Sequence, residues 1–346
     1  MPEATHRVCI VLGTRPEAIK LAPVIQLFKN SPNFDTQVIL TGQHREMVEQ
    51  VMQMFDLKAD RDLAIMQHQQ SLTDITSRSL QGLEALFKEL QPEIVLVQGD
   101  TTTAFAAALA AFYQKIPVGH VEAGLRTDDV FNPYPEEANR RLISQLTRLH
   151  FAPTELAAEN LGRSGVLGEI HRTGNTVIDA LLSVAKREPE CNIPNLDWSQ
   201  HRTILATVHR RENWGKPLAG IAKALPLHRN PTVREPLKAL LGDHPRIFLT
   251  EPLDYAELVG AMQRSHLILT DSGGLQEEAP SLGKPVLVLR ETTERPEAVS
   301  AGTAKLVGTN SDTITAKAAE LLSDSKAYDA MAMLFLGLKT NPKIGL

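Results

Sequence analysis

The sequence predicts an α/β protein built from two Rossmann-like, doubly wound parallel-sheet domains with a cleft between them. Short apolar runs alternate with amphipathic segments along the whole chain, which is typical of parallel strands joined by helices. The run IVLV, residues 94–97, is apolar throughout, as expected for a strand buried on both faces of its sheet. The length of 346 residues is enough for two domains with separate hydrophobic cores.

The predicted domain boundary lies in a proline-containing stretch with little periodicity, residues 187–201. Such a stretch is typical of a linker between domains. We therefore expect an N-terminal Rossmann-like domain over residues 1–186 and a C-terminal Rossmann-like domain over residues 202–346.

Composition narrows the class of protein and its compartment. The chain is 42% hydrophobic and 22% charged, with a net charge of −5, which is ordinary for a globular protein and argues against a nucleic-acid surface. It has no apolar run of membrane-spanning length. Neither Cys9 nor Cys191 lies in a CxxC pair, so we expect no disulfide framework, no zinc site and a reducing, cytoplasmic location.

The first predicted strand, residues 7–13, runs directly into a helix. Thr14 and Glu17 have the spacing of a capping box at the start of that helix. Arg15 and Lys20 therefore lie near the carboxyl end of the strand, where open α/β sheets bind their ligands. A solvated basic pair is the plain alternative, but an arginine in the turn itself favours a contact with an anion.

The next strand covers residues 37–40, and Gln43 and His44 follow its end. A polar loop is predicted over residues 66–76, which includes Gln70, and an amphipathic helix follows it. Part of the polar run that follows the strand at residues 37–40 is simply the start of a helix.

Residues 92–127 form a predicted strand–helix–strand unit with an alanine-rich helix. Asp100 ends the first of these strands and Glu122 ends the second, so both carboxylates are expected at the ligand-facing edge. The alternative is that they cap helices. That alternative is strong for Asp100, which precedes Thr101, and weaker for Glu122.

Another helix is predicted to start at Pro135, with Glu136, Glu137 and Arg140 near its beginning. Acidic residues in a first turn commonly interact only with the helix dipole, and Glu136 and Arg140 have the spacing of an i,i+4 pair. We interpret Glu137 as a dipole partner and leave the role of Glu136 open.

The second domain begins with a strand that ends in His209, Arg210 and Arg211. A single histidine at a strand end is usually structural. Flanked by two arginines at the edge that faces the cleft, His209 is a candidate for binding or proton transfer.

The most informative stretch is residues 267–299, in which a short apolar strand breaks at small residues and a helix follows. Free backbone N–H groups at such a helix start can bind an anion. Gly273 and Gly274 would let a phosphate approach the backbone closely. Glu278 is placed where it could accept hydrogen bonds from ribose hydroxyls, and Pro280 is predicted to end the helix. A tight turn capped by Asp271 or Ser272 is the alternative.

No GxGxxG, Walker A or metal-ligand pattern occurs. Together the motifs resemble the bacterial, non-hydrolysing UDP-N-acetylglucosamine (UDP-GlcNAc) 2-epimerases, and the resemblance rests on GTRPEAIK, TGQHREM, GDTTT, HVEAGLRT, PEEANR, TGNTVIDAL, HRREN, HRNPTVREP, TDSGGLQEEAPSLGKPVL and TTERPEAV. It implies a glycosyltransferase-B-like fold, a UDP-sugar bound between the domains, no cofactor and a homodimer.

The resemblance also implies roles for individual residues. The implied catalytic residues are Asp100, Glu122, Glu136 and His209. The implied substrate-binding residues are Arg15, Lys20, Arg140, Ser272, Gly273, Gly274 and Glu278, with Arg15 and His209 at the UDP portion and the group from Ser272 onward at the phosphates and ribose. The segments that hold Gln43, His44, Gln70, Arg210 and His228 correspond to those that bind a second, activating UDP-sugar.

The implied reaction is the reversible conversion of UDP-GlcNAc to UDP-N-acetylmannosamine (UDP-ManNAc), a precursor of cell-surface polysaccharides. UDP is eliminated to leave a bound 2-acetamidoglucal and is then added back. The sequence does not assign the acid and the base. Three alternatives stay open: a hydrolysing epimerase that releases ManNAc and UDP, a retaining glycosyltransferase of similar fold, and a UDP-sugar sensor without catalysis.

Two departures from the family pattern are visible. After residues 220–225 the chain passes directly to PLHRNPTVREP, and the C-terminal residues lack the family's NPYGDG-like turn. The resemblance implies one more strand near residue 225, and a second domain without that strand would have a gap in its sheet. We therefore expect the second domain to be shortened there and at its C-terminus, or to be rearranged.

Overall fold

The computed structural model describes residues 5–42, 45–67, 70–208, 246–248, 250–293 and 295–333. The chain divides into two compact units; within the described residues, the first ends at Ala180 and the second begins at Leu181. Residues 187–201, the predicted linker, contain neither helix nor strand. The domain boundaries drawn from the sequence stay a prediction.

The first unit is built on a seven-stranded sheet with strand order β3-β2-β1-β4-β5-β6-β7. Every pair of neighbouring strands is parallel. The strands are β1 (His6–Leu12), β2 (Phe34–Leu40), β3 (Arg61–Asp62), β4 (Ile94–Gln98), β5 (Val118–Val121), β6 (Leu149–Ala152) and β7 (Glu169–Arg172).

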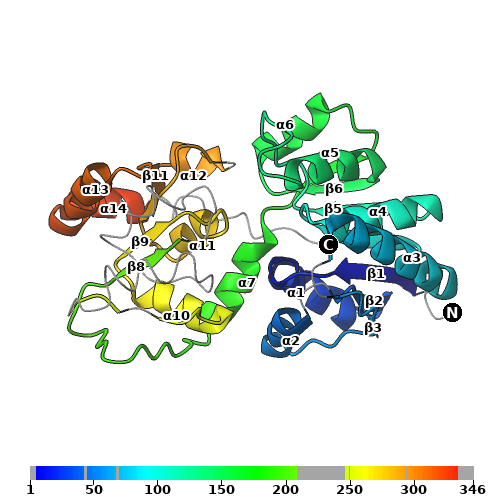
Figure 1. Ribbon diagram of the computed structural model, residues 1–346, viewed down its shortest axis with the longest axis horizontal. Helices are drawn as coiled ribbons and strands as arrows, with labels where there is room; N and C mark the ends of the chain where they lie inside the picture. The colour runs from blue at the N-terminus through cyan, green and yellow to red at the C-terminus, as the bar shows by residue number, and fades with distance from the viewer. Residues whose placement is uncertain are drawn as a thin grey trace. The chain divides into compact units, whose positions relative to one another are not determined.

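Helices cover both faces of this sheet (Figure 1). One layer contains α1 and α2, which pack against each other, and the other contains α3, α4 and α5, in which α4 contacts both neighbours. The helices are α1 (Arg15–Asn30), α2 (Arg45–Met54), α3 (Leu72–Leu90), α4 (Thr102–Tyr113), α5 (Glu136–Leu146), α6 (Glu155–Arg163) and α7 (Thr176–Ala185).

Helix α3 begins earlier than its sequence predicted. Residues 72–76 were expected in a polar loop, but they form the first turn of the helix. The Ser71 hydroxyl accepts a hydrogen bond from the Asp74 N–H at 3.1 Å, and the Asp74 carboxylate accepts one from the Ser71 N–H at 2.9 Å. This capping box satisfies the exposed end of the helix, so polar composition there does not indicate a loop.

One core cluster of the first unit lies between the sheet and the α3–α5 layer. Leu83 and Phe87 of α3 are buried there with Val95 and Val97 of β4. The side of α4 that joins this cluster consists mainly of alanines, so the helix can approach the sheet closely. This packing holds the carboxyl end of β4 in a fixed position.

The order of strands reverses between β1 and β4, which makes this pair the topological switch point of a doubly wound sheet. Cys9 pairs with Val95, and Gln98 pairs with Val121 of β5. The carboxyl ends of β1, β4 and β5 therefore meet at one edge. This is the edge at which Arg15, Asp100 and Glu122 were predicted.

The second unit has a described four-stranded parallel sheet with order β11-β10-β9-β8. Its strands are β8 (Ile204–Thr207), β9 (Leu267–Thr270), β10 (Val286–Val288) and β11 (Ala304–Leu306), and its helices are α10 (Tyr255–Arg264), α11 (Leu275–Ser281), α12 (Pro296–Ser300), α13 (Ser311–Ser323) and α14 (Ser325–Met333). Leu269 and Leu287 lie in its apolar core. Helix α11 ends at Ser281, one residue past Pro280, so its end agrees with the predicted one to within a residue.

The predicted fold class, two parallel-sheet α/β domains, is confirmed. The predicted gap near residue 225 lies outside the described residues. Within the part of the chain that the structure describes, no helix has the length and apolar character needed to cross a membrane.

Candidate functional site

The turn between β1 and α1 is held by a buried glutamate. Glu17 accepts hydrogen bonds from the backbone N–H groups of Gly13, at 2.9 Å, and Thr14, at 2.7 Å. It also accepts one from the Thr101 hydroxyl at 2.5 Å, and burial raises the pKa of this carboxyl. Glu17 thus ties the turn that carries Arg15 to the turn that follows β4.

Glu122 directly follows β5, and its backbone lies in the left-handed region with φ of 64°. A non-glycine residue held there is strained, and such strain gathers at functional sites. Its carboxylate oxygens lie 2.5 and 2.6 Å from Lys20 Nζ, and the Gln98 amide donates to it at 2.5 Å. Both members of the ion pair are largely buried, with side-chain exposures of 13% for Lys20 and 6% for Glu122.

Asp100 does not cap a helix. The N-cap of α4 is Thr101, whose hydroxyl accepts the Ala104 N–H at 3.0 Å, so the alternative considered for Asp100 is wrong. The Asp100 carboxylate instead accepts a hydrogen bond from Arg140 Nη1 at 3.0 Å, and its side chain is 29% exposed. It is therefore partnered and still accessible.

Glu137 has a larger role than the dipole partner that the sequence indicated. It is fully buried and accepts bonds from Arg140 Nε at 3.0 Å, Arg141 Nε at 2.7 Å and the Thr127 N–H at 3.0 Å. Arg140 thus pairs with Glu137 and Asp100, and the i,i+4 pair considered for Glu136 and Arg140 is not formed among the described contacts. The i,i+3 and i,i+4 spacings from Glu137 to the two arginines were the available signal.

Removal from water and the charges nearby together set the pKa of the Asp100 carboxyl. Removal from water raises the pKa of its carboxyl to about 6. The positive charges of Arg140 and Lys20 oppose this rise in pKa. The negative charges of Glu122 and Glu136 add to it. A carboxyl with such a pKa can both accept and release a proton near neutral pH.

In the second unit, the turn after β9 leads into α11 as predicted. Gly274 is the N-cap, and no side chain caps the helix, so capping by Asp271 or Ser272 is not observed. Among the described residues, a Cβ atom on Gly274 would meet Glu278 Oε2 alone, at 3.6 Å, which leaves room beside these residues for a group to approach. Glu278 is buried and accepts the Tyr255 hydroxyl at 2.8 Å.

The structure thus gathers the predicted residues into two groups, one on each unit. The group at the carboxyl edge of the first unit contains Lys20, Asp100, Glu122, Glu136 and Arg140. The group in the second unit contains Ser272, Gly273, Gly274 and Glu278. Gln70 accepts the Gln67 N–H at 3.0 Å in the loop before α3, and Arg15 begins α1. Gln43, His44, His209, Arg210 and His228 lie outside the described residues.

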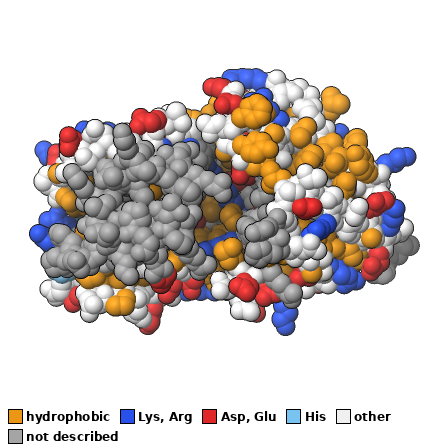
Figure 2. Space-filling model, viewed as in Figure 1, with side chains coloured by type: hydrophobic (Ala, Val, Ile, Leu, Met, Phe, Trp, Pro, Cys, Tyr) orange, Lys and Arg blue, Asp and Glu red, His pale blue; other side chains and the backbone are white. Residues whose placement is uncertain are grey.

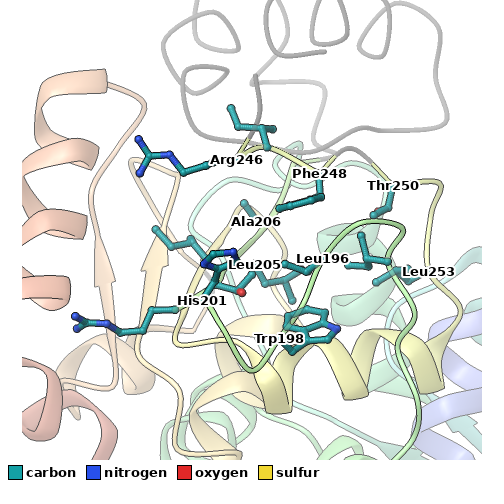
Figure 3. Close-up of a pocket in the computed structure, with 14 residues that line it drawn as sticks. Leu196, Trp198, His201, Leu205, Ala206, Arg246, Phe248, Thr250 and Leu253 are labelled. Carbon is teal, nitrogen blue, oxygen red and sulfur yellow. The ribbon is translucent and has the colours of Figure 1, made fainter. Parts of the chain in front are cut away.

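A cavity of about 420 Å³ lies beside β8 in the second unit (Figure 3). Trp198, Leu205 and Phe248 are among its lining residues, together with Arg246. None of the predicted site residues that the structure describes lines this cavity. Among the described residues, no cluster of three or more histidine, cysteine or acidic side chains has the arrangement of a metal site.

Comparison with known proteins identifies related sequences and structures. Residues 26–344 match the family model described as UDP-N-acetylglucosamine 2-epimerase. A relative from Escherichia coli (strain K12), named UDP-N-acetylglucosamine 2-epimerase, is 49% identical over 350 residues, which cover 94% of this chain and 93% of the relative.

Solved structures of UDP-GlcNAc 2-epimerases are also similar to this chain. The UDP-GlcNAc 2-epimerase of Neisseria meningitidis bound to UDP-GlcNAc is 48% identical, with a TM-score of 0.86 and 94% of each chain covered. The UDP-GlcNAc 2-epimerase of Methanocaldococcus jannaschii in complex with UDP-GlcNAc and UDP is 32% identical, with a TM-score of 0.79 and coverage of 96% of this chain and 100% of the other.

Proposed function

The chain belongs to the UDP-N-acetylglucosamine 2-epimerase family, and from this premise we propose that it interconverts UDP-GlcNAc and UDP-ManNAc without hydrolysing them. It is accordingly an isomerase, the enzyme class that its sequence predicted. The observation that carries the proposal is the group of Asp100, Glu122, Lys20 and Arg140 at one sheet edge. Solved relatives that bind UDP-GlcNAc support the substrate.

The substrate itself dictates the type of reaction. The C2 proton of an N-acetylhexosamine is not next to a carbonyl carbon, so its direct removal would give an unstabilised carbanion. In the proposed route a base takes the C2 proton while the C1–O bond breaks and its electrons leave with UDP. The resulting 2-acetamidoglucal stays bound. A proton is then delivered to C2 from the other face, and UDP oxygen re-forms the bond to C1.

Two proton-transfer groups are needed, one for each face of the sugar. Asp100 is suited to be one of them because its pKa lies near 6 and its side chain is partly exposed. Glu122 is less suited, because both of its oxygens are engaged by Lys20. We assign the second transfer to Glu136, which lies close enough to influence Asp100, and we assign Glu122 the role of a fixed negative charge near the positive charge that develops at C1.

The second unit is assigned to the nucleotide. The open space at Gly274 supports a phosphate at the turn formed with Ser272 and Gly273. Glu278, oriented by the Tyr255 hydroxyl, would accept hydrogen bonds from the ribose. Arg15 and His209 would contact the UDP portion. The product would supply cell-surface polysaccharide synthesis in the cytoplasm.

The direct test is proton NMR of the purified protein with UDP-GlcNAc in D2O. UDP-ManNAc that carries deuterium at C2 is the expected product, because the proposed route exchanges the C2 proton with solvent. Free ManNAc with UDP would transfer the assignment to a hydrolysing epimerase. Saturable binding without any product would favour a sensor.

The pH dependence provides a prediction about Asp100. If ionised Asp100 accepts the C2 proton, kcat/KM in the forward direction falls as pH drops through about 6. Replacing Arg140 with Gln removes the positive charge that opposes protonation. The acidic limb should therefore move to higher pH by about one unit. Arg141→Gln is the matched control, because Arg141 bonds Glu137 and not Asp100, and its limb should stay in place.

We also assign a homodimer, with an apolar patch on the first unit as its interface. Phe112 and Tyr113 at the end of α4 are 53% and 62% exposed, and Leu142 of the adjacent α5 is 49% exposed. Figure 2 shows hydrophobic side chains gathered over this region. Exposed apolar patches of this kind mark association surfaces. The double variant Phe112→Ser, Leu142→Glu should shift the mass in solution from dimer to monomer, whereas Leu27→Ser, at an exposed leucine of α1, should leave it unchanged.

A further inference from the structure

The peptide groups on both sides of Asp100 are each held by one buried side chain. The carbonyl of Gly99 lies 2.7 Å from Nε2 of His120, and the carbonyl of Asp100 accepts a hydrogen bond from Nδ2 of Asn139 at 2.9 Å. We propose that His120 and Asn139 are positioning residues that fix the direction of the Asp100 carboxylate for proton transfer at C2. This inference rests on the function proposed above.

His120 acts as a hydrogen-bond donor to the carbonyl of Gly99. It belongs to β5 and is fully buried. Burial lowers the pKa of its imidazole to about 4, so the ring is neutral at working pH. Because a carbonyl only accepts, the single ring proton must be on Nε2. His120 is therefore a permanent hydrogen-bond donor to the turn and not a proton carrier.

Gly99 is the residue of this turn whose backbone conformation depends on such a hydrogen bond. Its φ of 69° lies in the left-handed region, and glycine has the widest choice of backbone conformations. Its N–H already donates to the Val121 carbonyl at 3.0 Å. With His120 on the carbonyl, both peptide groups of Gly99 are tied to β5. Loss of the donor would leave a buried carbonyl unpaired and the peptide free to rotate.

Asn139 holds the peptide group that follows, at the carbonyl of Asp100. It lies on α5, is 7% exposed, and immediately precedes Arg140, which bonds the carboxylate of the same aspartate. Two consecutive residues of one helix thus hold the main chain and the side chain of Asp100. A shift of the Asp100 peptide would lengthen the bond to Arg140, and small misplacements of a reacting group are costly in rate.

The variants His120→Leu and His120→Gln test this role, with His150→Leu as the matched control. Leucine removes the donor, whereas the amide nitrogen of glutamine can replace Nε2. His150 pairs with His120 across β5 and β6, is equally buried and has no hydrogen-bond partner on either ring nitrogen among the residues that the structure describes. Its replacement therefore perturbs the same region without touching the Asp100 turn.

We expect His120→Leu to lower kcat about 100-fold with little change in KM or in UDP affinity, measured by titration calorimetry. Its acidic limb should move to higher pH, because Asp100 loses part of its contact with Arg140. His120→Gln should recover most of kcat, and Asn139→Leu should reproduce the loss. His150→Leu should keep kcat whatever happens to its melting temperature.

Two results would overturn the inference. One is wild-type kcat and an unmoved acidic limb in His120→Leu. The other is a loss of kcat in both His120→Leu and His150→Leu that parallels the drop in melting temperature of each variant, while His120→Gln recovers no kcat. That result would indicate that His120 has a structural role only. A wild-type protein without epimerase activity would instead refute the proposed function, so the two failures are distinguishable.

Discussion

Asp100→Asn is expected to lower kcat for epimerisation by about three orders of magnitude, within the range that general acid–base groups contribute. Asparagine keeps the size of the side chain and can still contact Arg140, but it cannot take up a proton. UDP affinity should stay near the wild-type value, because Asp100 is not among the residues assigned to the nucleotide. Deuterium incorporation at C2, followed by NMR in D2O, should fall together with turnover.

Asp35→Asn is a suitable control, since Asp35 forms a partly exposed pair with Arg7 at the other end of the sheet. It should leave kcat unchanged. Retention of more than a tenth of wild-type kcat in Asp100→Asn would mean that Asp100 does not carry the C2 proton. In that case Glu136→Gln becomes the decisive variant.

Lys20→Met is expected to produce the largest loss of stability. It leaves the Glu122 carboxylate, 6% exposed, without its cation in a strained backbone position. Removal of one partner of a buried ion pair costs about 3 kcal/mol or more of unfolding free energy. For a unit of this size, that loss corresponds to a drop of roughly 6–12 °C in the melting temperature, which calorimetry would measure at pH 7.5.

The double variant Lys20→Met, Glu122→Gln separates stability from catalysis. It removes both charges, so most of the lost stability should return while turnover stays absent. Lys29→Met is the matched control on the same helix. Lys29 pairs with Asp60, and both side chains are about one third exposed, so its loss should cost about 1 kcal/mol or less. A Lys20→Met variant as stable as Lys29→Met would contradict the buried-pair argument.

The sequence predicted the fold because its evidence is local. Runs such as residues 94–97 and 267–269 are apolar over the length of one strand, and the residues that follow them are small or polar. Since parallel strands in a doubly wound sheet share one ligand-facing edge, placing strand ends in the sequence was enough to place Asp100 and Glu122. The capping box of Glu17 was equally local, and the structure contains it.

Partners across the fold could not be predicted in the same way. Lys20 and Glu122 are 102 residues apart, and nothing in either neighbourhood specifies the other. The role of Glu137 depends on burial, which a polar helix start does not indicate. His120 looks like one more residue of a strand until the carbonyl of Gly99 is seen beside it. Side-chain pairing is decided by strand register and packing, and neither of these is written in a short window of sequence.

The left-handed backbone of Glu122 also bears on which mutations at this position could stabilise the protein. Holding a glutamate at φ of 64° costs about 1–2 kcal/mol relative to glycine. Mutation to glycine would, however, leave the largely buried ammonium group of Lys20 without its partner, which costs about 3 kcal/mol or more. Most proteins lie just above the stability they need, and stabilising replacements are easily reached. A single mutation to glycine at position 122 is therefore not such a replacement. Laboratory selection for heat resistance alone should reach glycine there only together with a change that removes the charge of Lys20.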